Sequence, residues 1–260
     1  MKKMRKTKSV LQPDELKSLF SLANGKDLKN LDEDLLDKNY AKEKSRMVLS
    51  YIKKYNKDAD KILELGAGLG YNLYYFPDKY NLWGIDHEKA YVKIARKIVP
   101  EGRILQADIK DFKINEKFDV IFCISDTLNY MPDFNSLKDS FENIRQHIND
   151  KGIFIFDLYK QNAPEILRGF EDITPFNNGY YIEKPLSNGN KILWDFEIFK
   201  KNNNGYKSVY HSRIEQKVFS EKRTSNLILE NFSILERVDC KNLDNLLKDP
   251  SKELIICRKN

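Results

Sequence analysis

The sequence predicts an α/β fold: a doubly wound, seven-stranded sheet, mostly parallel with an antiparallel last strand, and an antiparallel β insertion after strand five. Between residues 61 and 158, short apolar runs alternate with amphipathic helical patterns, as in a parallel sheet covered on both faces. The first apolar run ends in a glycine-rich turn. Beyond residue 178, apolar residues recur with period two, which is typical of antiparallel strands.

The first part of the chain predicts alternating strands and helices. Strands are expected at Ile62–Leu65, Leu82–Asp86, Arg103–Ala107, Phe118–Ile124 and Gly152–Asp157. Helices are expected at Pro13–Leu22, Tyr40–Tyr55, Asn72–Phe76, Lys89–Ile98 and Asn135–Ile148. In the Tyr40–Tyr55 segment, Met47, Val48, Tyr51 and Ile52 form an apolar stripe at helical spacing. This rhythm ends after Asp157.

The remaining residues predict a β-rich insertion and then a return to the sheet. Residues 160–178 are expected to be irregular with short helical pieces. Asn202–Gly205 is a hairpin turn between two long strands, and Trp194 lies on the apolar face of the first of them. A helix near Ser220–Leu229 and strands near Ser233–Cys240 and Glu253–Cys257 follow. We therefore expect a helical or lid segment over residues 1–36, a core over residues 37–158 and 220–260, and a substrate-binding insertion over residues 159–219.

Composition limits the classes of function. Of the 260 residues, 41% are hydrophobic and 32% are charged, as in an ordinary globular protein. No apolar run approaches the roughly 20 residues of a membrane helix, and no apolar signal core follows the basic N-terminus, so a cytoplasmic protein without membrane contact is expected. The net charge of +6 is spread along the chain, which argues against nucleic acid as a partner. Three cysteines within apolar runs, with no C-x-x-C pair, indicate no metal site.

The segment from Lys61 to Gly70 is the most informative motif. The acid Glu64 ends a short apolar run, and three alternating glycines, Gly66, Gly68 and Gly70, follow it. Such a strand, turn and helix start form the first half of a nucleotide-binding βαβ unit, in which glycine lets the backbone approach a ligand. A dinucleotide site would need its third glycine at position 71, which is Tyr71. The motif therefore favours another adenosine-bearing cofactor.

Two later acids follow strand ends, where ligands bind in open sheets. Asp86 ends the second predicted strand and is suited to accept hydrogen bonds from a ribose, although capping the next helix is the alternative. Asp108 follows the third strand, and Asp111 lies close enough in sequence to be confused with it. These positions extend the predicted cofactor site along the sheet edge.

Together these segments resemble the class I S-adenosylmethionine-dependent methyltransferases, and specifically their small-molecule branch. That branch includes the N,N-dimethyltransferases of nucleotide-linked amino sugars. The resemblance covers roughly residues 37–257 and rests on segments that occur in one order: Asp37–Glu43, the glycine loop, Gly84–Asp86, Ile94–Arg96, Ala107–Phe112 and Ser125–Met131. It implies a Rossmann-like fold and S-adenosylmethionine as cofactor, with S-adenosylhomocysteine as product and no metal. The Ser125–Met131 loop has neither the Pro-Pro-aromatic signature of amino DNA methyltransferases nor the Pro-Cys of cytosine-C5 enzymes.

The resemblance also implies site residues. The residues predicted to bind the cofactor are Tyr40, Glu64, Gly66, Ala67, Gly68, Gly70, Asp86, His87, Asp108, Ile109, Ile124 and Ser125. Tyr130 stands where the sugar-amine enzymes place a histidine, and a phenol with a reference pKa near 10 is better suited to orient an acceptor than to act as a base. His211 is the candidate base for a hydroxyl acceptor, with a structural role as the alternative.

The function expected from the sequence is transfer of a methyl group, in line, to a small-molecule amine or hydroxyl. An amine is favoured because no convincing base motif is present. The alternatives are methylation of RNA or protein, and a non-catalytic module that binds S-adenosylmethionine. The sequence does not name the acceptor and leaves homodimer formation open.

Overall fold

The computed structural model describes residues 38–176, 179–243 and 247–260. The predicted N-terminal segment over residues 1–36, with its helix at Pro13–Leu22, lies outside these ranges.

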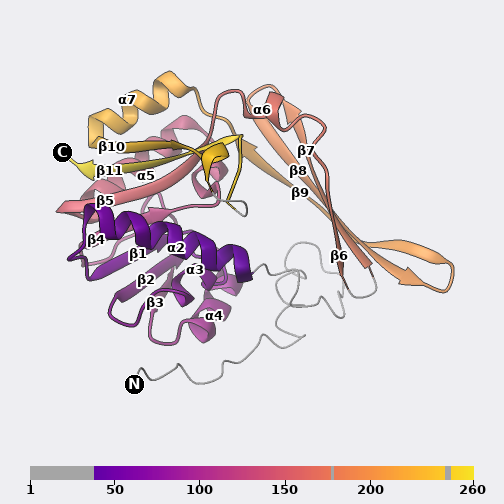
Figure 1. Ribbon diagram of the computed structural model, residues 1–260, viewed down its shortest axis with the longest axis horizontal. Coiled ribbons are helices and arrows are strands. Elements are labelled where there is room, and N and C mark those ends of the chain that lie inside the picture. Colours follow the sequence, from indigo (N-terminus) through magenta and orange to yellow (C-terminus); the bar gives the residue numbers. More distant parts are fainter. Residues whose placement is uncertain (1–37, 177–178, 244–246) are drawn as a thin grey trace.

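The larger of two sheets contains seven strands in the order β10-β11-β5-β4-β1-β2-β3 (Figure 1). Their bounds are β1 (Lys61–Leu65), β2 (Asn81–Asp86), β3 (Arg103–Gln106), β4 (Phe118–Cys123), β5 (Ile148–Tyr159), β10 (Phe232–Asp239) and β11 (Lys252–Lys259). Strands β1 to β5 pair in parallel, and β11 runs antiparallel between β5 and β10. The predicted mostly parallel sheet with an antiparallel last strand is confirmed.

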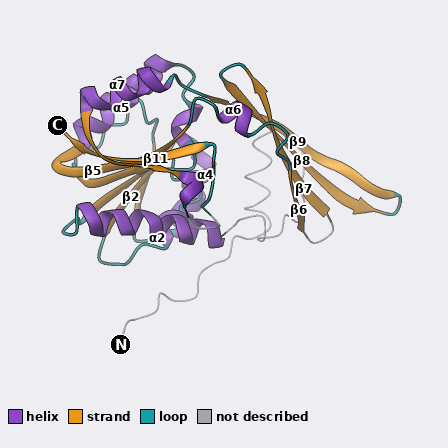
Figure 2. Ribbon diagram, turned by 45° about the horizontal axis from the view of Figure 1, so that its top comes forward, coloured by secondary structure: helices purple, strands orange, loops and turns teal. Residues whose placement is uncertain are grey.

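Helices cover both faces of this sheet (Figures 1 and 2). On one face lie α2 (Lys38–Tyr55), α3 (Tyr71–Tyr74) and α4 (Lys89–Ile98), and on the other lie α5 (Phe134–His147) and α7 (Glu221–Asn231). The α2 stripe is confirmed, since Val48 and Ile52 are fully buried against the sheet. No helix among the described residues is long and apolar enough to cross a membrane.

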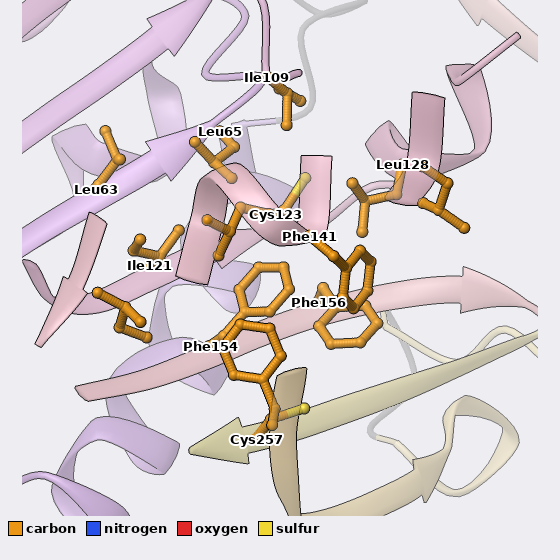
Figure 3. Close-up of a cluster of buried hydrophobic side chains, with 14 of the residues drawn as sticks. Leu63, Leu65, Ile109, Ile121, Cys123, Leu128, Phe141, Phe154, Phe156 and Cys257 are labelled. Atoms are coloured by element: carbon orange, nitrogen blue, oxygen red, sulfur yellow. The ribbon is translucent and has the colours of Figure 1, made fainter. Parts of the chain in front are cut away.

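Successive residues of each strand pack into hydrophobic clusters on opposite faces of the sheet. Ile62 packs toward α2 and α4, and its neighbour Leu63 packs toward α5 and α7, because successive strand residues point to opposite faces. Phe141, Phe154 and Phe156 form an aromatic group on the second face, with centroids of Phe154 and Phe156 4.5 Å apart (Figure 3). Each buried ring contributes about 1.5–3 kcal/mol relative to an exposed one. Burial on both faces explains why the sequence shows near-continuous apolar runs.

A second, antiparallel sheet follows β5 and the short helix α6 (Ala163–Ile166), and it projects to one side of the larger sheet (Figure 1). Its strands in order are β6 (Asp172–Phe176), β7 (Gly179–Asn188), β8 (Lys191–Asn202) and β9 (Gly205–Lys217). The predicted turn joins β8 to β9, and the Asn202 side chain accepts a hydrogen bond from the Asn204 backbone at 2.9 Å.

Three predicted elements differ from the structure. Residues 160–178 contain the strand β6, which we expected to be irregular. Pro175 lacks a backbone donor, and the sheet accommodates it because β6 is an edge strand. The helix predicted at Asn72–Phe76 is a single turn, α3, and the strand predicted at Gly152–Asp157 extends in both directions as β5. Tertiary pairing with β4 and β11 explains the longer strand.

Candidate functional site

The glycine loop follows β1 and opens at its centre. Gly66, Gly68 and Gly70 all adopt positive φ angles, of 69°, 50° and 81°. A side chain at Gly66 would lie 2.4 Å from Thr127, and one at Gly70 would lie 3.1 Å from Ala95, so both positions are closely packed. A Cβ atom at Gly68 would meet nothing within 4 Å. The loop therefore brings its backbone to the edge of an open space at Gly68.

Asp86 joins this loop to the start of α4. Its side chain is buried, and its carboxylate accepts hydrogen bonds from the backbone N–H groups of Gly68 at 2.8 Å and Glu88 at 2.9 Å. The carboxylate thus holds the turn before α4 and accepts from Gly68, beside the open space, whereas the N-cap residue of α4 is Glu88. The neighbouring His87 side chain is 74% exposed.

The carboxylate of Glu64 is buried, and only one of its two oxygens accepts a hydrogen bond from a described residue. Its Oε1 accepts a hydrogen bond from the Asn72 side chain at 2.7 Å, whereas Oε2 has no partner among the described residues. Burial raises the pKa of Glu64 to about 8, against the smaller influence of Asn72 and the Lys44 ammonium. A buried acceptor without a partner costs free energy, and a ligand that donates a hydrogen bond removes that cost. This observation fits a cofactor with an amino group.

The shifted pKa of Glu64 predicts a pH-dependent stability. The folded protein binds more protons at this site than the unfolded chain between about pH 4.5 and about pH 8, so its contribution to stability is lost as the pH rises through that window. Glu64→Gln does not ionise. We expect the melting temperature of the ligand-free wild type to fall, relative to Glu64→Gln, from pH 5 to pH 8. Thermal unfolding curves at several pH values check this, and a constant difference between the two proteins would contradict it.

The loop after β4 is held in an unusual backbone conformation. Ser125 and Asp126 have φ angles of 68° and 53°, which non-glycine residues rarely adopt. The Asp157 carboxylate accepts hydrogen bonds from both of their N–H groups, at 2.9 and 2.8 Å. Burial raises the pKa of Asp157 to about 6. Such strain costs on the order of 1–3 kcal/mol per residue and is concentrated at functional sites, so this loop is a candidate for presenting a reactive group.

Lys44 on α2 is a site residue that sequence reasoning missed. Its ammonium donates a hydrogen bond to the Ser125 hydroxyl and lies 3.8 Å from the centre of the Tyr40 ring. Burial lowers the pKa of Lys44 to about 8 and raises the pKa of Tyr40 to about 12. Lys44 precedes Val48 by one helical turn, so the apolar stripe already placed it on the buried face of the helix.

Asp126 is the centre of a second network that the sequence did not reveal. The Lys252 ammonium donates a hydrogen bond to its Oδ1, and the Gln216 amide donates to its Oδ2 at 2.8 Å. The Gln216 carbonyl accepts from the Tyr159 hydroxyl at 2.8 Å, which in turn accepts from the Trp194 indole at 3.1 Å. Although burial acts to raise the pKa of Asp126, Lys252 lowers it below its ordinary value. The network joins the β4 loop to β5, β11 and the second sheet.

Asn129 in the same loop fixes the second sheet in place. It is fully buried, and its amide donates to the Lys217 carbonyl at 2.7 Å while its carbonyl accepts from the Tyr159 N–H at 3.3 Å. The adjacent Tyr130 is 48% exposed, and Asp126 and Tyr91 both lie near enough to act on its phenol. The loop therefore contacts both sheets, through β5 and β9, and carries the partly exposed Tyr130.

The remaining predicted site residues lie either at the sheet edge that carries the glycine loop or in the core. Ala67 lies within the loop, and its N–H donates to the Ile85 carbonyl at 2.8 Å. Asp108 follows β3 with a partly exposed carboxylate that accepts from the Lys110 N–H at 2.9 Å. Ile109 and Ile124 are buried in the two core clusters on opposite faces of the sheet.

The structure places His211 away from the rest of the site. Its ring lies 2.7 Å from the Asp195 carboxylate, which also accepts from Arg213 at 2.7 Å. His211 opposes Glu197 in the β8–β9 ladder, and Gln216 opposes Ile192, so the two side chains point to opposite faces of the sheet. Since Gln216 contacts Asp126, His211 lies on the outer face. His211 therefore does not join the Asp126 network, and its role as a base stays a prediction.

Metal ligands do not gather in the described part of the chain: no group of three or more His, Cys, Asp or Glu side chains there could hold a metal ion.

Comparisons with known proteins agree with this architecture. Residues 62–152 match the family described as a methyltransferase domain. A dTDP-4-amino-2,3,4,6-tetradeoxy-D-glucose N,N-dimethyltransferase from Saccharopolyspora spinosa is 32% identical over 101 residues, which are 38% of this chain and 41% of the relative. The chain thus spans less than half the length of this curated relative.

Solved structures share the fold over most of the chain. An S-adenosylmethionine-dependent methyltransferase from Clostridium acetobutylicum ATCC 824 superposes with a TM-score of 0.71 and 22% identity, covering 83% of this chain and 90% of that one. The S-adenosylmethionine-bound CalS10, an amino pentose methyltransferase from Micromonospora echinaspora, gives a TM-score of 0.75 at 15% identity, covering 89% and 99%. Residues 62–152 thus match a methyltransferase domain, the chain shares the Rossmann-like fold of these solved structures, and it resembles the small-molecule branch of the class I S-adenosylmethionine-dependent enzymes, as its motifs predict.

Proposed function

We propose that the chain is an S-adenosylmethionine-dependent N-methyltransferase that acts on a small-molecule amine. The observations that carry the proposal are the open space at Gly68, whose N–H donates to the Asp86 carboxylate, and a buried Glu64 oxygen that has no partner among the described residues. These groups match a ligand that combines a nucleoside with an amino acid. The methyltransferase-domain match over residues 62–152 supports the same reading.

Each charged group along this edge has a counterpart in such a ligand. The Asp86 carboxylate is suited to the ribose hydroxyls. The Glu64 carboxylate is suited to the methionine ammonium, and the Lys44 ammonium to the methionine carboxylate. Asp108 would accept from the adenine amino group, as the family resemblance implies. Together these residues would fix the sulfonium at the end of β4, beside the Ser125–Asp126 turn.

The bound cofactor supplies an activated methyl group, and the protein supplies binding and orientation. The β4 loop, held by Asp157 and Asn129, would align an acceptor from the side of the second sheet. A neutral amine held in line with that methyl group would need no protein base, because the proton of the product amine could pass to water. Holding the reactants in line contributes several kcal/mol to lowering the barrier.

The positions of the three histidines favour an amine as the acceptor over a hydroxyl. A hydroxyl acceptor needs a base with a pKa near 7, which a histidine would supply. His211 is on the outer face of the second sheet, and His147 is buried on α5 with its ring 4.3 Å from Phe112. His87 points mostly into solvent. The Saccharopolyspora relative is named for N,N-dimethylation, which supports the amino group as acceptor but does not extend its nucleotide sugar to this chain.

Calorimetry with S-adenosylhomocysteine tests the cofactor site. We expect Asp86→Ala to weaken binding by at least about a hundredfold, because two charge-assisted hydrogen bonds and the loop geometry are lost together. Asp150→Ala is the control, because the Asp150 side chain is 94% exposed. Equal binding by all three proteins would overturn the assignment.

Transfer of labelled methyl groups to a pool of small amines and alcohols tests the reaction. We expect label on amines only. Label on alcohols would contradict N-methylation, and cofactor binding without transfer to any acceptor would favour the non-catalytic alternative.

A further inference from the structure

The inner face of the second sheet bears on which acceptor fits this site. Directly paired residues in an antiparallel ladder lie on the same side, and Gln216 and Trp194, which both belong to the Asp126 network, mark the side toward the site. Phe196 follows Trp194 by two residues and opposes Glu183 on β7. Tyr181 precedes Glu183 by two residues. We call Tyr181, Glu183, Trp194 and Phe196 the inner patch.

Three aromatic rings of the inner patch are arranged as a continuous surface. The rings of Tyr181 and Phe196 are stacked with centroids 6.0 Å apart and an interplanar angle of 22°. Those of Phe196 and Trp194 are also stacked, at 6.3 Å and 17°. The faces of such rings attract cations, most strongly for tryptophan.

Glu183 adds a negative charge to this surface. Its carboxylate accepts a hydrogen bond from the Tyr181 hydroxyl at 2.9 Å. Burial raises the pKa of Glu183, and among the neighbouring charges the Asp172 carboxylate, which opposes Glu183 directly on β6, raises it most. An anionic ligand group here would meet two carboxylates, those of Glu183 and Asp172.

On the outer face of the same sheet, by contrast, the carboxylates form ion pairs. Asp195 lies within ion-pair distance of His211, Arg213 and Lys184, and Glu215 pairs with two lysines. Within the described ranges, Glu183 forms no ion pair with a lysine, arginine or histidine side chain. The contrast indicates that the Glu183 carboxylate is available to a cationic group of a ligand, since no described residue forms an ion pair with it.

We propose that the inner patch binds a positively charged group of the acceptor, with Glu183 as the counter-ion and the three rings as its walls. This rests on the proposed function. Methyl transfer requires an amine with a free lone pair, so the charged group is distinct from the nitrogen that is methylated. The acceptor then belongs to the organic amines that carry a second cationic group and no phosphate or carboxylate near it.

Three five-carbon probes test the charge preference at constant length. They are 1,5-diaminopentane, 5-amino-1-pentanol and 5-aminopentanoate, whose far ends are cationic, neutral and anionic. Each is titrated into the full chain saturated with S-adenosylhomocysteine, with calorimetry and tryptophan fluorescence as readouts. We expect the diamine to bind about tenfold or more tightly than the amino alcohol, and the amino acid to bind weakest.

Glu183→Gln should remove this preference, so that the diamine and the amino alcohol bind within about threefold of each other. Glu197→Gln is the matched control, because it removes the same charge from the outer face and should keep the preference. Equal binding of the three probes by the wild type, tighter binding of the amino acid, no binding of the diamine, or an unchanged preference in Glu183→Gln would each overturn the inference. Failure of S-adenosylhomocysteine itself to bind would instead overturn the proposed function.

Discussion

Gly68→Arg is expected to abolish binding of S-adenosylmethionine and S-adenosylhomocysteine, with a loss of at least about a thousandfold in affinity. A Cβ atom at Gly68 meets nothing within 4 Å, so the variant would fold without a steric clash at this position. Its arginine side chain would occupy the space proposed for the nucleoside. It would also disturb the backbone N–H that donates to Asp86. Loss of about 4 kcal/mol corresponds to this factor. Calorimetry with S-adenosylhomocysteine measures it.

Gly189→Arg is the matched control for this experiment. Gly189 lies in the turn between β7 and β8, has a φ of 62°, and also has open space around it. The two substitutions therefore add the same side chain and charge, with similar backbone strain of about 1–2 kcal/mol. We expect similar melting temperatures for the two variants and normal cofactor binding only for Gly189→Arg. Tight binding by Gly68→Arg would refute the location of the site.

Lys252→Met is expected to have the largest effect on stability. Lys252 and Asp126 form a largely buried ion pair, with side chains 12% and 16% exposed. Although burial alone lowers the pKa of Lys252, Asp126 raises it well above its ordinary value. Removing one partner leaves a buried charge uncompensated, which costs about 3–5 kcal/mol. Urea unfolding of the two proteins measures the loss.

The double variant Asp126→Asn, Lys252→Met separates the ion pair from the packing. Asparagine keeps the shape of Asp126 and removes the unpaired charge, so the double variant should recover most of the stability lost by Lys252→Met. Lys259→Met is the control on the same strand, since its partner Asp150 is exposed and such pairs contribute about 0–1 kcal/mol. Equal losses for Lys252→Met and the double variant would contradict the account.

The strands of the larger sheet could be predicted closely because each is a buried apolar run bounded by polar turns. The antiparallel last strand came from the family resemblance rather than from local pattern, and the order of the strands in the sheet was not predicted. The edge strand β6 was missed because a proline such as Pro175 argues against a strand unless that strand lies at a sheet edge. An edge position is known only once the sheet is assembled.

The candidate site was predictable where it is local in sequence. The glycine loop, Asp86 and the loop after β4 each follow a strand end, and parallel strands bring those ends to one edge. Lys252 could not be assigned from pattern, because a lysine is ordinarily exposed, and the pattern placed Lys44 on the buried face of its helix without giving its partner. Their roles come from contacts with Ser125 and Asp126 across 81 and 126 residues of chain.

By itself, the sequence of this protein determined where most of the strands and helices lie and which turn is the candidate for a nucleoside site, because periodicity and glycine act over a few neighbouring residues. Only the tertiary structure decided that His211 faces outward, that Glu183 faces inward without a cation among the described residues, and that Asp126 is paired with Lys252. Which face a strand residue occupies, and which charge meets another, depends on strand pairing between distant segments, which local sequence does not encode.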